Sequence, residues 1–370
     1  MKKDYDIKFM NYAINLSHKN YGITGKNPSV GCVIAYDNKI IATGVTNQGG
    51  RPHAEKIAID KVADKKTLKK STLYVSLEPC CKNDHNGITC CDYIIKNNIS
   101  RVVIGTKDSN PQINGKSIEK LRKHNIEVVT NILTSKAQKI NHFFQFSQKY
   151  QRPFVTLKIA TSLDGKIATK NFDSKWITSK GAREYSHFLR ASYDGILVGA
   201  NTLRIDNPQL NCRLKNLESH SPKIFILSQK MDFDHNLQIF SQENAEIYLI
   251  SPNSWQNIEK FNKIKSFNQN LNHITFENEY EYLNKIYQFG IKSLLVEGGS
   301  NIATQFIKDY KVDRIIWIGN KKIIGNDGLS AINNLDVREI NQAINNYKIV
   351  KFKALEEDFM LILDNVNRLS

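Results

Sequence analysis

The feature that most constrains this chain of 370 residues is a set of metal-binding side chains between positions 53 and 91. H-A-E at 53 to 55 is followed by E-P-C at 78 to 80 and by a second cysteine pair, Cys90 and Cys91. Cysteine thiolates and a neutral imidazole suit Zn²⁺, and three protein ligands leave one position for a water whose pKa the metal lowers toward about 7. The fold is therefore expected to bring these segments together around one ion.

A carboxylate stands two residues after the histidine of this set. In hydrolytic deaminases a glutamate near the zinc-binding histidine moves protons without contacting the metal, and one group can serve both water addition and amine loss. Glu55 has that position here. An isolated H-x-E is more often the start of a surface helix, but the later P-C and cysteine pair favour a zinc site.

The spacing leaves open which cysteines bind the metal. Four of the six cysteines crowd into residues 80 to 91, and in a reducing compartment such crowding favours metal binding over disulfides. Cys80 and Cys90 are the first candidates, and Cys81 and Cys91 are the next. A structural site with four cysteines is an alternative, in which no position for water would remain.

Length and composition indicate two folded domains. The chain exceeds one typical domain of about 100 to 200 residues, and its hydrophobic (41%) and charged (24%) fractions are ordinary for globular proteins. The N-terminus has no apolar run suited to a signal peptide, and no segment reaches the roughly 18 apolar residues of a membrane span. We therefore expect a cytoplasmic protein without a membrane partner.

The net charge of +16 is compatible with nucleic acid or with small anionic substrates. The lysines are scattered along the chain among many asparagines, so we interpret the charge as a solvated surface rather than a nucleic-acid face.

Short apolar strands alternate with helices in the first 150 residues, a pattern typical of a layered α/β domain. Strands are predicted at 30–36, 40–44, 72–77, 101–106 and 126–130, and helices at 5–20, 53–62, 92–98, 116–124 and 135–149. This places His53 at a helix N-terminus and Cys80 just after a strand. Arg152-Pro153 resembles a boundary, and we assign residues 1–150 and 151–370 to two domains.

The second domain repeats the alternation without a metal cluster or a nucleophilic triad in its sequence. Strands are predicted at 154–160, 195–199, 223–228, 246–251, 293–299 and 314–319, with a helix at 182–190. No strand is followed by G-x-G-x-x-G. On pattern alone, S-L-D-G-K at 162–166 and D-N-P at 206–208 are ordinary loops.

Segments in both halves resemble the bifunctional deaminase/reductase family of riboflavin biosynthesis. In the first half they are N-P-S-V-G-C-V-I (27–34), G-G-R-P-H-A-E (49–55), L-E-P-C (77–80), H-N-G-I-T-C (85–90) and D-S-N-P (108–111). In the second they are R-P-F-V-T-L-K-I-A-T-S-L-D-G-K-I-A, S-K-W-I-T-S, A-R-E-Y-S-H-F-L-R, L-V-G-A-N-T-L-R-I-D-N-P-Q-L-N-C-R and V-E-G-G-S. The resemblance implies an α/β fold, with a cytidine-deaminase-like three-layer α/β/α domain followed by a dihydrofolate-reductase-like α/β domain that binds NADPH without the dinucleotide fingerprint.

The same resemblance implies the site residues. In the deaminase domain (1–150) these are the zinc ligands His53, Cys80 and Cys90, the proton carrier Glu55 and a substrate contact at Asn27. In the reductase domain (151–370), the implied NADPH contacts are Ala160, Trp176, Thr202, Asp206, Ser228 and the backbone of Gly298, Gly299 and Ser300. The implied substrate contacts there are Lys158, Ser174, Arg190, Leu210, Arg213 and Glu297. Arginine suits a ribose phosphate because its planar fork binds two oxygens.

The implied function is hydrolytic, zinc-dependent deamination of 2,5-diamino-6-(5-phosphoribosylamino)pyrimidin-4(3H)-one. It is followed by NADPH-dependent reduction of the ribosyl group of 5-amino-6-(5-phosphoribosylamino)uracil to the ribityl form. The cofactors are Zn²⁺ and NADPH, and Lys158 and Asp206 are the nearest candidates for the reductase proton donor. We expect phosphorylated pyrimidines as partners, no nucleic acid, and a homo-oligomer.

The first site departs from the family pattern in two places. T-C-C stands where the family usually has T-P-P-C, after the additional residues C-K-N-D, and Thr46 stands where the family has a histidine. Two other functions stay open. A nucleic-acid (tRNA) base deaminase shares H-x-E and P-C but usually pairs its cysteines as P-C-x-x-C and lacks a reductase half, and a zinc-structured binding module would have no catalysis.

Overall fold

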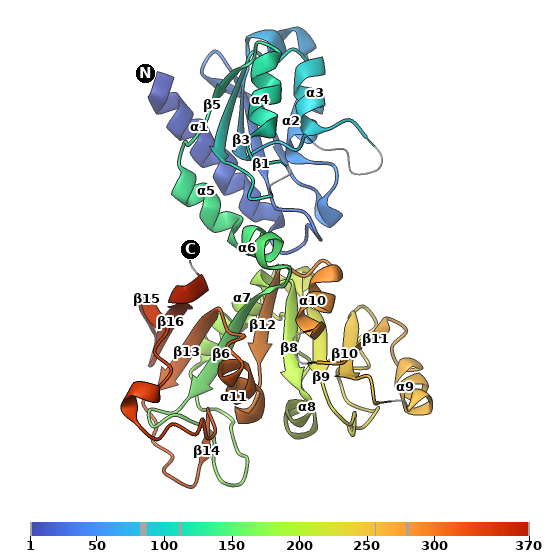
Figure 1. Cartoon of the computed structure of the whole chain (residues 1–370), viewed down its shortest axis with the longest axis vertical. Coiled ribbons are helices and arrows are strands. Elements are labelled where there is room, and N and C mark those ends of the chain that lie inside the picture. The colour runs from blue at the N-terminus through green and yellow to red at the C-terminus, as the bar shows by residue number, and fades with distance from the viewer. Residues whose placement is uncertain (1, 82–86, 111–112, 256, 279–280, 369–370) are drawn as a thin grey trace. The chain divides into compact units, whose positions relative to one another are not determined.

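The computed structural model describes residues 2–81, 87–110, 113–255, 257–278 and 281–368. The chain divides into two compact units, Met1–Arg152 and Pro153–Ser370 (Figure 1). Within the described ranges, every helix is too short or too polar to traverse a lipid bilayer.

The first unit is built on a five-stranded sheet in the order β2-β1-β3-β4-β5. The strands are β1 (Gly31–Tyr36), β2 (Lys39–Val45), β3 (Thr72–Leu77), β4 (Arg101–Thr106) and β5 (Glu127–Val129). β1 is antiparallel to β2 and β3, whereas β3, β4 and β5 are parallel. Parallel neighbours need long crossovers, which explains the alternation of strand and helix in the sequence.

Helices cover both faces of this sheet and make three layers (Figure 1). One face packs against α1 (Lys2–Ser17) and α5 (Thr134–Ile140), and the other against α2 (Ala54–Asp60), α3 (Cys90–Lys96) and α4 (Lys116–Lys123). The unit also contains α6 (His142–Tyr150) and the 3-10 turns η1 (His18–Asn20), η2 (Gln48–Gly50) and η3 (Lys65–Lys70). The predicted three-layer α/β/α domain is confirmed. The single helix expected at 135–149 is instead two helices, because the chain leaves helical geometry at Asn141 (φ −93°, ψ 13°).

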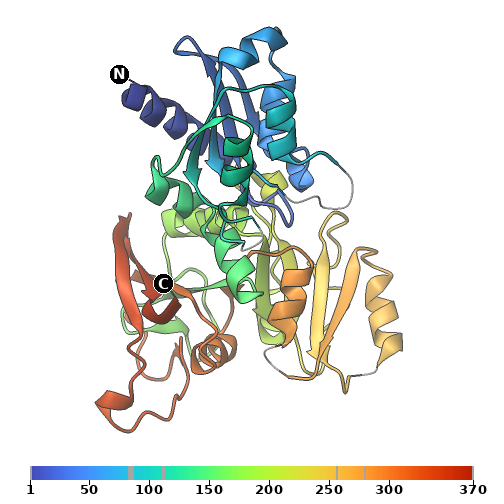
Figure 2. The ribbon, with the colours of Figure 1, turned by 45° about the horizontal axis from the view of Figure 1, so that its top comes forward.

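The second unit is built on a nine-stranded sheet in the order β11-β10-β9-β8-β12-β6-β13-β16-β15. The strands are β6 (Phe154–Thr161), β8 (Gly195–Gly199), β9 (Lys223–Leu227), β10 (Ile247–Pro252), β11 (Leu271–Phe276), β12 (Ser293–Glu297), β13 (Arg314–Asn320), β15 (Tyr347–Leu355) and β16 (Asp358–Asn365). All neighbours from β11 to β13 are parallel, and only β16 pairs antiparallel with β13 and β15. Figure 2 shows the gold strands of one edge and the red strands of the other at opposite ends of the unit.

Two apolar cores flank this sheet. One contains side chains of α10 (Glu281–Gln288) and α11 (Ser300–Lys308), and the other contains side chains of α8 (Ala200–Asp206) and α9 (Ile258–Lys265). The remaining elements are α7 (Lys180–Ser192), the strand pair β7 (Lys166–Ala168) and β14 (Leu329–Ser330), and the 3-10 turns η4 (Glu218–His220), η5 (Ile340–Gln342) and η6 (Val366–Arg368). Because α8 and α11 begin directly after β8 and β12, their N-termini lie at the carboxyl ends of parallel strands, the usual place for ligands in such sheets.

Candidate active sites

The predicted metal ligands come from three separate elements of the first unit. His53 is the N-cap residue of α2 and has extended backbone geometry (φ −71°, ψ 158°). Cys90 is the first residue of α3, whose N-terminus is capped by Thr89 through the N–H of Asp92 (3.1 Å). Cys80 follows β3. The His53 Nδ1 atom lies 3.2 Å from Cys90 Sγ and 3.6 Å from Cys80 Sγ, and all three ligand atoms lie within 4.8 Å of one another.

These distances fit a zinc ion. Zn–S bonds of about 2.3 Å and a Zn–N bond of about 2.1 Å at tetrahedral angles separate the ligand atoms by roughly 3.5 to 3.8 Å. Cys81 and Cys91 are directed elsewhere: Cys91 Sγ lies 3.8 Å from the Ser117 carbonyl, and Cys81 packs against the apolar core. Of the cysteines expected to compete, the structure gathers Cys80 and Cys90 beside His53.

The two thiols of this group differ in acidity. Hydrogen bonds from Cys90 and from His53 lower the pKa of Cys80 to about 4. Cys90 is hydrogen-bonded to Cys80, and this bond raises the pKa of Cys90. The hydrogen bond between His53 and Cys80 likewise raises the pKa of His53. The arrangement therefore favours the ionised form of Cys80, and thiolates are the form that binds zinc.

Glu55 lies in the first turn of α2 and is buried. Burial raises the pKa of its carboxyl group, against the opposing effect of His53. A carboxyl group whose pKa is raised toward neutrality exchanges protons more effectively as a general acid and base. Glu55 shares a cavity of about 250 Å³ with His53, Cys80 and the predicted substrate contact Asn27.

A second buried carboxylate, Glu78, also lines this cavity. It accepts hydrogen bonds from Ser117 Oγ (2.5 Å), from the N–H of Asp108 (3.2 Å) and from the N–H of Gly115 (3.1 Å). Asp108 also lines the cavity, and burial raises its pKa to about 6. Sequence reasoning gave neither residue a role, although both stand in the segments E-P-C and D-S-N-P.

The structure describes Thr46 and the T-C-C segment (89–91) of the two departures from the family pattern. Thr46 lines the cavity and its Oγ accepts a hydrogen bond from the N–H of Val30 (3.0 Å). Residues 82–86, which include most of the additional segment, lie outside the described residues.

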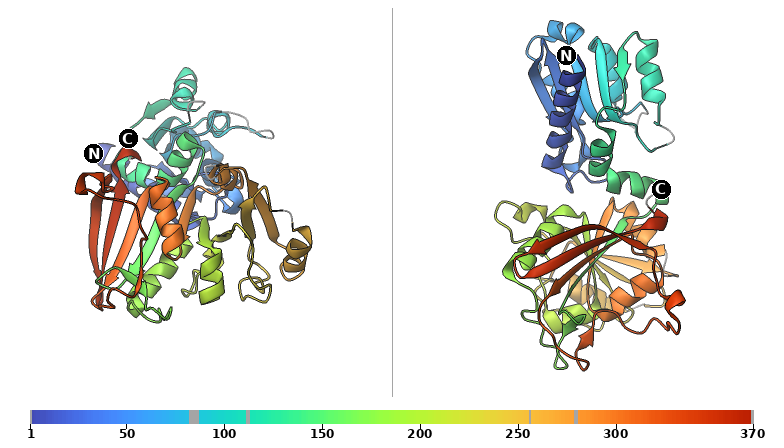
Figure 3. Two further views of the ribbon diagram at one scale, coloured as in Figure 1. Left: turned by 60° about the horizontal axis from the view of Figure 1, so that its bottom comes forward. Right: turned by 90° about the vertical axis from the view of Figure 1, so that its left-hand side faces the viewer.

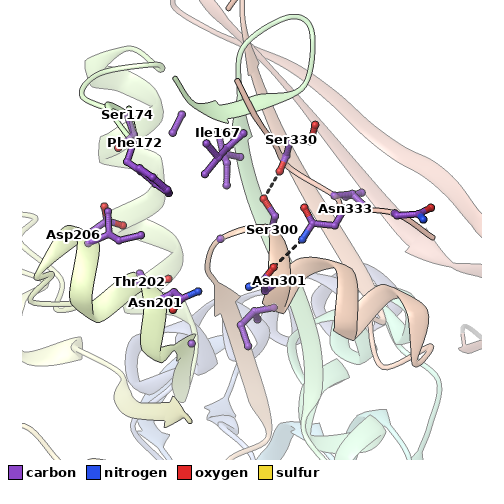
Figure 4. A pocket seen from close by; sticks show the side chains of 18 residues that line it. Ile167, Phe172, Ser174, Asn201, Thr202, Asp206, Ser300, Asn301, Ser330 and Asn333 are labelled. Carbon is purple, nitrogen blue, oxygen red and sulfur yellow. Dashed lines mark hydrogen bonds between the residues drawn. The ribbon is translucent and has the colours of Figure 1, made fainter. Parts of the chain in front are cut away.

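The second site is a cavity of about 670 Å³ at the carboxyl ends of β6, β8 and β12. A neighbouring cavity of about 560 Å³ shares some of its residues (Figure 4). Together they are lined by all but one of the residues predicted for this half, namely Lys158, Ala160, Ser174, Trp176, Arg190, Thr202, Asp206, Leu210, Arg213, Glu297, Gly298, Gly299 and Ser300.

Ser228 is the residue that the structure does not bring into either cavity lining. It follows β9 and is buried, with Oγ accepting from the N–H of Met231 (2.8 Å) and its N–H donating to the Ile250 carbonyl (2.9 Å). Its contact with NADPH stays a prediction.

A compact charge group lies in the larger cavity. Arg190 Nε donates to Glu297 Oε1 (3.1 Å) and Arg190 Nη2 donates to Glu297 Oε2 (2.9 Å). Burial alone would raise the pKa of Glu297, but Arg190 and Lys158 outweigh it and lower that pKa to about 2. Burial lowers the pKa of Lys158, against the attraction of Glu297.

The start of α11 fits the diphosphate of NADPH. Gly299 is the N-cap residue and provides no side-chain cap, and a Cβ atom at this position would meet nothing within 4 Å. The first N–H groups of the helix are thus available to an anion that approaches the backbone closely. Figure 4 shows Ser300 and Asn301 of α11 on one side of the pocket and Asn201 and Thr202 of α8 on the other.

Helix α7 adds cavity residues that sequence reasoning missed. Lys180, Arg183 and His187 line the larger cavity together with Arg190. Their spacing of three and four residues, which places side chains on one face of a helix, was the available signal.

The fold and sites define a two-domain enzyme, a zinc-dependent deaminase joined to an NADPH-dependent reductase. Residues 3–106 match the cytidine and deoxycytidylate deaminase zinc-binding region, and residues 153–361 match the RibD C-terminal domain. The chain is 36% identical to the riboflavin biosynthesis protein RibD of Aquifex aeolicus (98% of this chain, 99% of the relative) and 33% identical to that of Bacillus amyloliquefaciens (95% and 96%). The solved deaminase/reductase of Thermotoga maritima has a TM-score of 0.85 at 34% identity (99% and 100% covered), and RibD of Acinetobacter baumannii, form 2, has 0.88 at 26% (98% and 99%). The chain therefore belongs to the RibD family of bifunctional riboflavin-biosynthesis enzymes.

Proposed function

We propose that the first unit converts 2,5-diamino-6-(5-phosphoribosylamino)pyrimidin-4(3H)-one to the corresponding uracil, and that the second unit reduces the ribosyl group of that product to a ribityl chain. The observation that carries the proposal is the triangle of His53, Cys80 and Cys90 beside buried Glu55 in one cavity. Zinc held by this triangle would supply a Lewis acid that lowers the pKa of water toward about 7.

Glu55 has the proton-transfer role in the deamination. Its carboxylate takes a proton from the attacking water and gives it to the neighbouring ring nitrogen as the oxygen adds to the ring carbon. It then carries the remaining hydroxyl proton to the amine, so that the C–N bond breaks, ammonia leaves and a carbonyl remains. The raised pKa of Glu55 supports this role because the carboxyl group can hold the proton between the two steps. Asn27, which lines the same cavity, is assigned to substrate binding.

The second unit positions two anionic molecules. NADPH, when bound, supplies the hydride that reaches C1′ of the ribosylamino group. Arg190 and Arg213 are assigned to the substrate phosphate, and the N-terminus of α11 to the cofactor diphosphate.

Opening of the sugar requires a proton on the ring oxygen, and two cavity residues are candidates for it. Burial raises the pKa of Asp206 and lowers the pKa of Lys158. Both shifts bring the groups nearer to neutral pH, where proton transfer is most effective.

A coupled assay tests the two activities. Purified protein is analysed for bound zinc, then given the diaminopyrimidinone phosphate while ammonia release and NADPH oxidation are followed. The proposal expects both signals, with ammonia preceding NADPH oxidation. Zinc-loaded protein that releases no ammonia and oxidises no NADPH would contradict it.

We also propose a cytoplasmic homo-oligomer that binds no nucleic acid. All six cysteines are free thiols in the described structure, which supports a reducing compartment. The larger cavity of the second unit contains the charge group of Lys158, Arg190 and Glu297. This cavity supports an enzyme that acts on small phosphorylated substrates rather than a tRNA base deaminase. Specific tRNA binding at physiological salt by a protein without NADPH oxidation would favour the alternative.

A further inference from the structure

Trp176 is a large side chain that little packing holds in place. The residue is 61% exposed, although it lines the larger cavity of the reductase unit. More than half of the residue stays in contact with water, so burial supplies only part of what fixes the orientation of its ring. Because Trp176 is assigned to the NADPH site, whatever selects its rotamer bears on cofactor binding.

Arg183 supplies a specific contact to this ring. Its guanidinium carbon lies 4.4 Å from the centroid of the Trp176 ring, well inside the range of cation–π attraction. The guanidinium is fixed in turn, because Nη1 donates a hydrogen bond of 2.8 Å to the carbonyl of Thr178. The contact therefore links the exposed indole to the N-terminal turn of α7.

Hydrogen bonds fix the backbone at the start of α7, next to this contact. Ser179 caps the helix by accepting from the N–H of Ala182 (3.3 Å), and the N–H of Ser179 donates to Asp358 on β16 (2.8 Å). Lys322 Nζ hydrogen-bonds to the carbonyl of Trp176 from the chain that follows β13. Trp176 is thus held at its side chain by one cation and at its backbone by another.

We propose that Arg183 is a positioning residue of the reductase, which holds the Trp176 ring in the orientation that contacts bound NADPH. The inference rests on the proposed assignment of Trp176 to the cofactor site. Removing the guanidinium leaves the indole free to turn into solvent, so NADPH binds less tightly while turnover at saturating cofactor changes little. The expected loss of affinity is about three- to fivefold, equivalent to roughly 0.7 to 1 kcal/mol.

A double-mutant cycle on the full chain tests the proposal. The dissociation constant of NADPH is measured for the wild type, Arg183→Gln, Trp176→Ala and the double variant. In the protein that keeps Trp176, Arg183→Gln should raise the dissociation constant about three- to fivefold. In the Trp176→Ala protein, the same substitution should leave the constant unchanged. An equal loss on both backgrounds would mean that Arg183 acts directly on the cofactor, and no loss on either would mean that it has no role; both results overturn the proposal.

Two further variants test whether the effect depends on the charge at position 183. Arg183→Lys should recover part of the affinity, because an ammonium group can also lie over an indole but lacks the fork that reaches Thr178. Arg338→Gln, which removes an exposed arginine outside both cavity linings, is the matched control and should bind NADPH like the wild type. Wild-type protein that binds no NADPH would refute the proposed function itself, whereas normal wild-type binding with an additive cycle refutes only the role of Arg183.

Discussion

Lys158 and Glu297 are partners in the register of the parallel strands β6 and β12. Glu297 also accepts two hydrogen bonds from Arg190. One carboxylate therefore attracts two cations, Arg190 through hydrogen bonds and Lys158 through charge. The group carries a net positive charge inside a cavity, where low dielectric strengthens its attraction for an anion. A phosphorylated substrate would supply the missing negative charge, and Glu297 would hold the two cations in place before it arrives.

Replacing Glu297 with Gln should destabilise the reductase unit in a pH-dependent way. The folded pKa of about 2 lies below the ordinary value of about 4.3, so the ionised carboxylate stabilises the fold above the ordinary pKa and loses this effect as pH falls toward 2. We expect the variant to lose about 3 kcal/mol of unfolding free energy at pH 7, with the difference shrinking below about pH 5.

Urea unfolding at pH 7, 4 and 3 measures this difference, because most of the linked stability is lost between the two pKa values. Glu246→Gln is the control, because Glu246 pairs with Lys223 on the half-exposed surface, where an ion pair contributes at most about 1 kcal/mol. A deficit for Glu297→Gln that stays the same at every pH would show that the carboxylate charge is not its cause.

Glu55→Gln should abolish deamination and spare reduction. The amide keeps the size of the side chain but cannot accept and return a proton, so ammonia release should fall by about 10²- to 10⁴-fold. Bound zinc and NADPH oxidation on supplied uracil substrate should stay at wild-type levels. Glu119→Gln, an exposed change in the same unit, is the control. Loss of NADPH oxidation along with ammonia release would contradict independent sites.

Cys90→Ser should lower the zinc content, and Cys91→Ser should not. Cys90 Sγ lies 3.2 Å from the histidine nitrogen, whereas Cys91 Sγ is directed to the Ser117 carbonyl. Metal analysis of both variants, with Cys212→Ser in the other unit as control, decides between them. Depleted zinc in Cys91→Ser with normal zinc in Cys90→Ser would show that Cys91, and not Cys90, is the zinc ligand.

Much of the first site could be predicted because its chemistry is carried by residue types at short spacing. His53 and Glu55 stand two residues apart at a helix start, and a strand delivers Cys80, so local patterns were enough. The spacing alone did not separate Cys90 from Cys91, because their places at the start of α3 decide which sulfur lies beside His53 and which lies beside the Ser117 carbonyl. Asp108 and Glu78 were missed because their roles depend on hydrogen bonds between segments far apart in sequence.

The outermost strand of the second sheet, β15, was not predicted, and one backbone irregularity explains why. In β15 the register shifts between Ile349 and Lys351, so Val350 is an extra residue. Ile349 and Phe352 share a face although they are three residues apart, and the period of two that marks a strand is lost. Elements α9, β11 and α10 were missed for a different reason, because polar residues dilute their apolar pattern.

This same edge supports the proposed homo-oligomer. Directly paired residues of antiparallel strands share a face, so Ile349 aligns with Leu363 and Ile315, and Phe352 aligns with Leu361 and Trp317. These two apolar rows cross three strands and end on side chains that are 62% (Ile349) and 67% (Phe352) exposed. The right-hand view of Figure 3 shows these strands at the outside of the unit.

A second copy of the chain is the partner that the rows would fit. The six side chains of these rows are all apolar, so a second chain packed on them would remove apolar surface from water. The outer edge of β15 also presents backbone groups that have no strand partner among the described residues, a common route to pairing between chains.

Ile349→Glu with Phe352→Glu should therefore convert the oligomer to monomers, because each buried carboxylate would lose its hydration without a partner. Light scattering after size-exclusion chromatography measures the mass, and Phe267→Glu, which charges an exposed aromatic residue on neither row, is the matched control. We expect wild type and control to have at least twice the chain mass and the double variant to have the mass of one chain. A wild type that is monomeric at micromolar concentration would contradict the homo-oligomer, and an oligomeric double variant would move its interface away from β15.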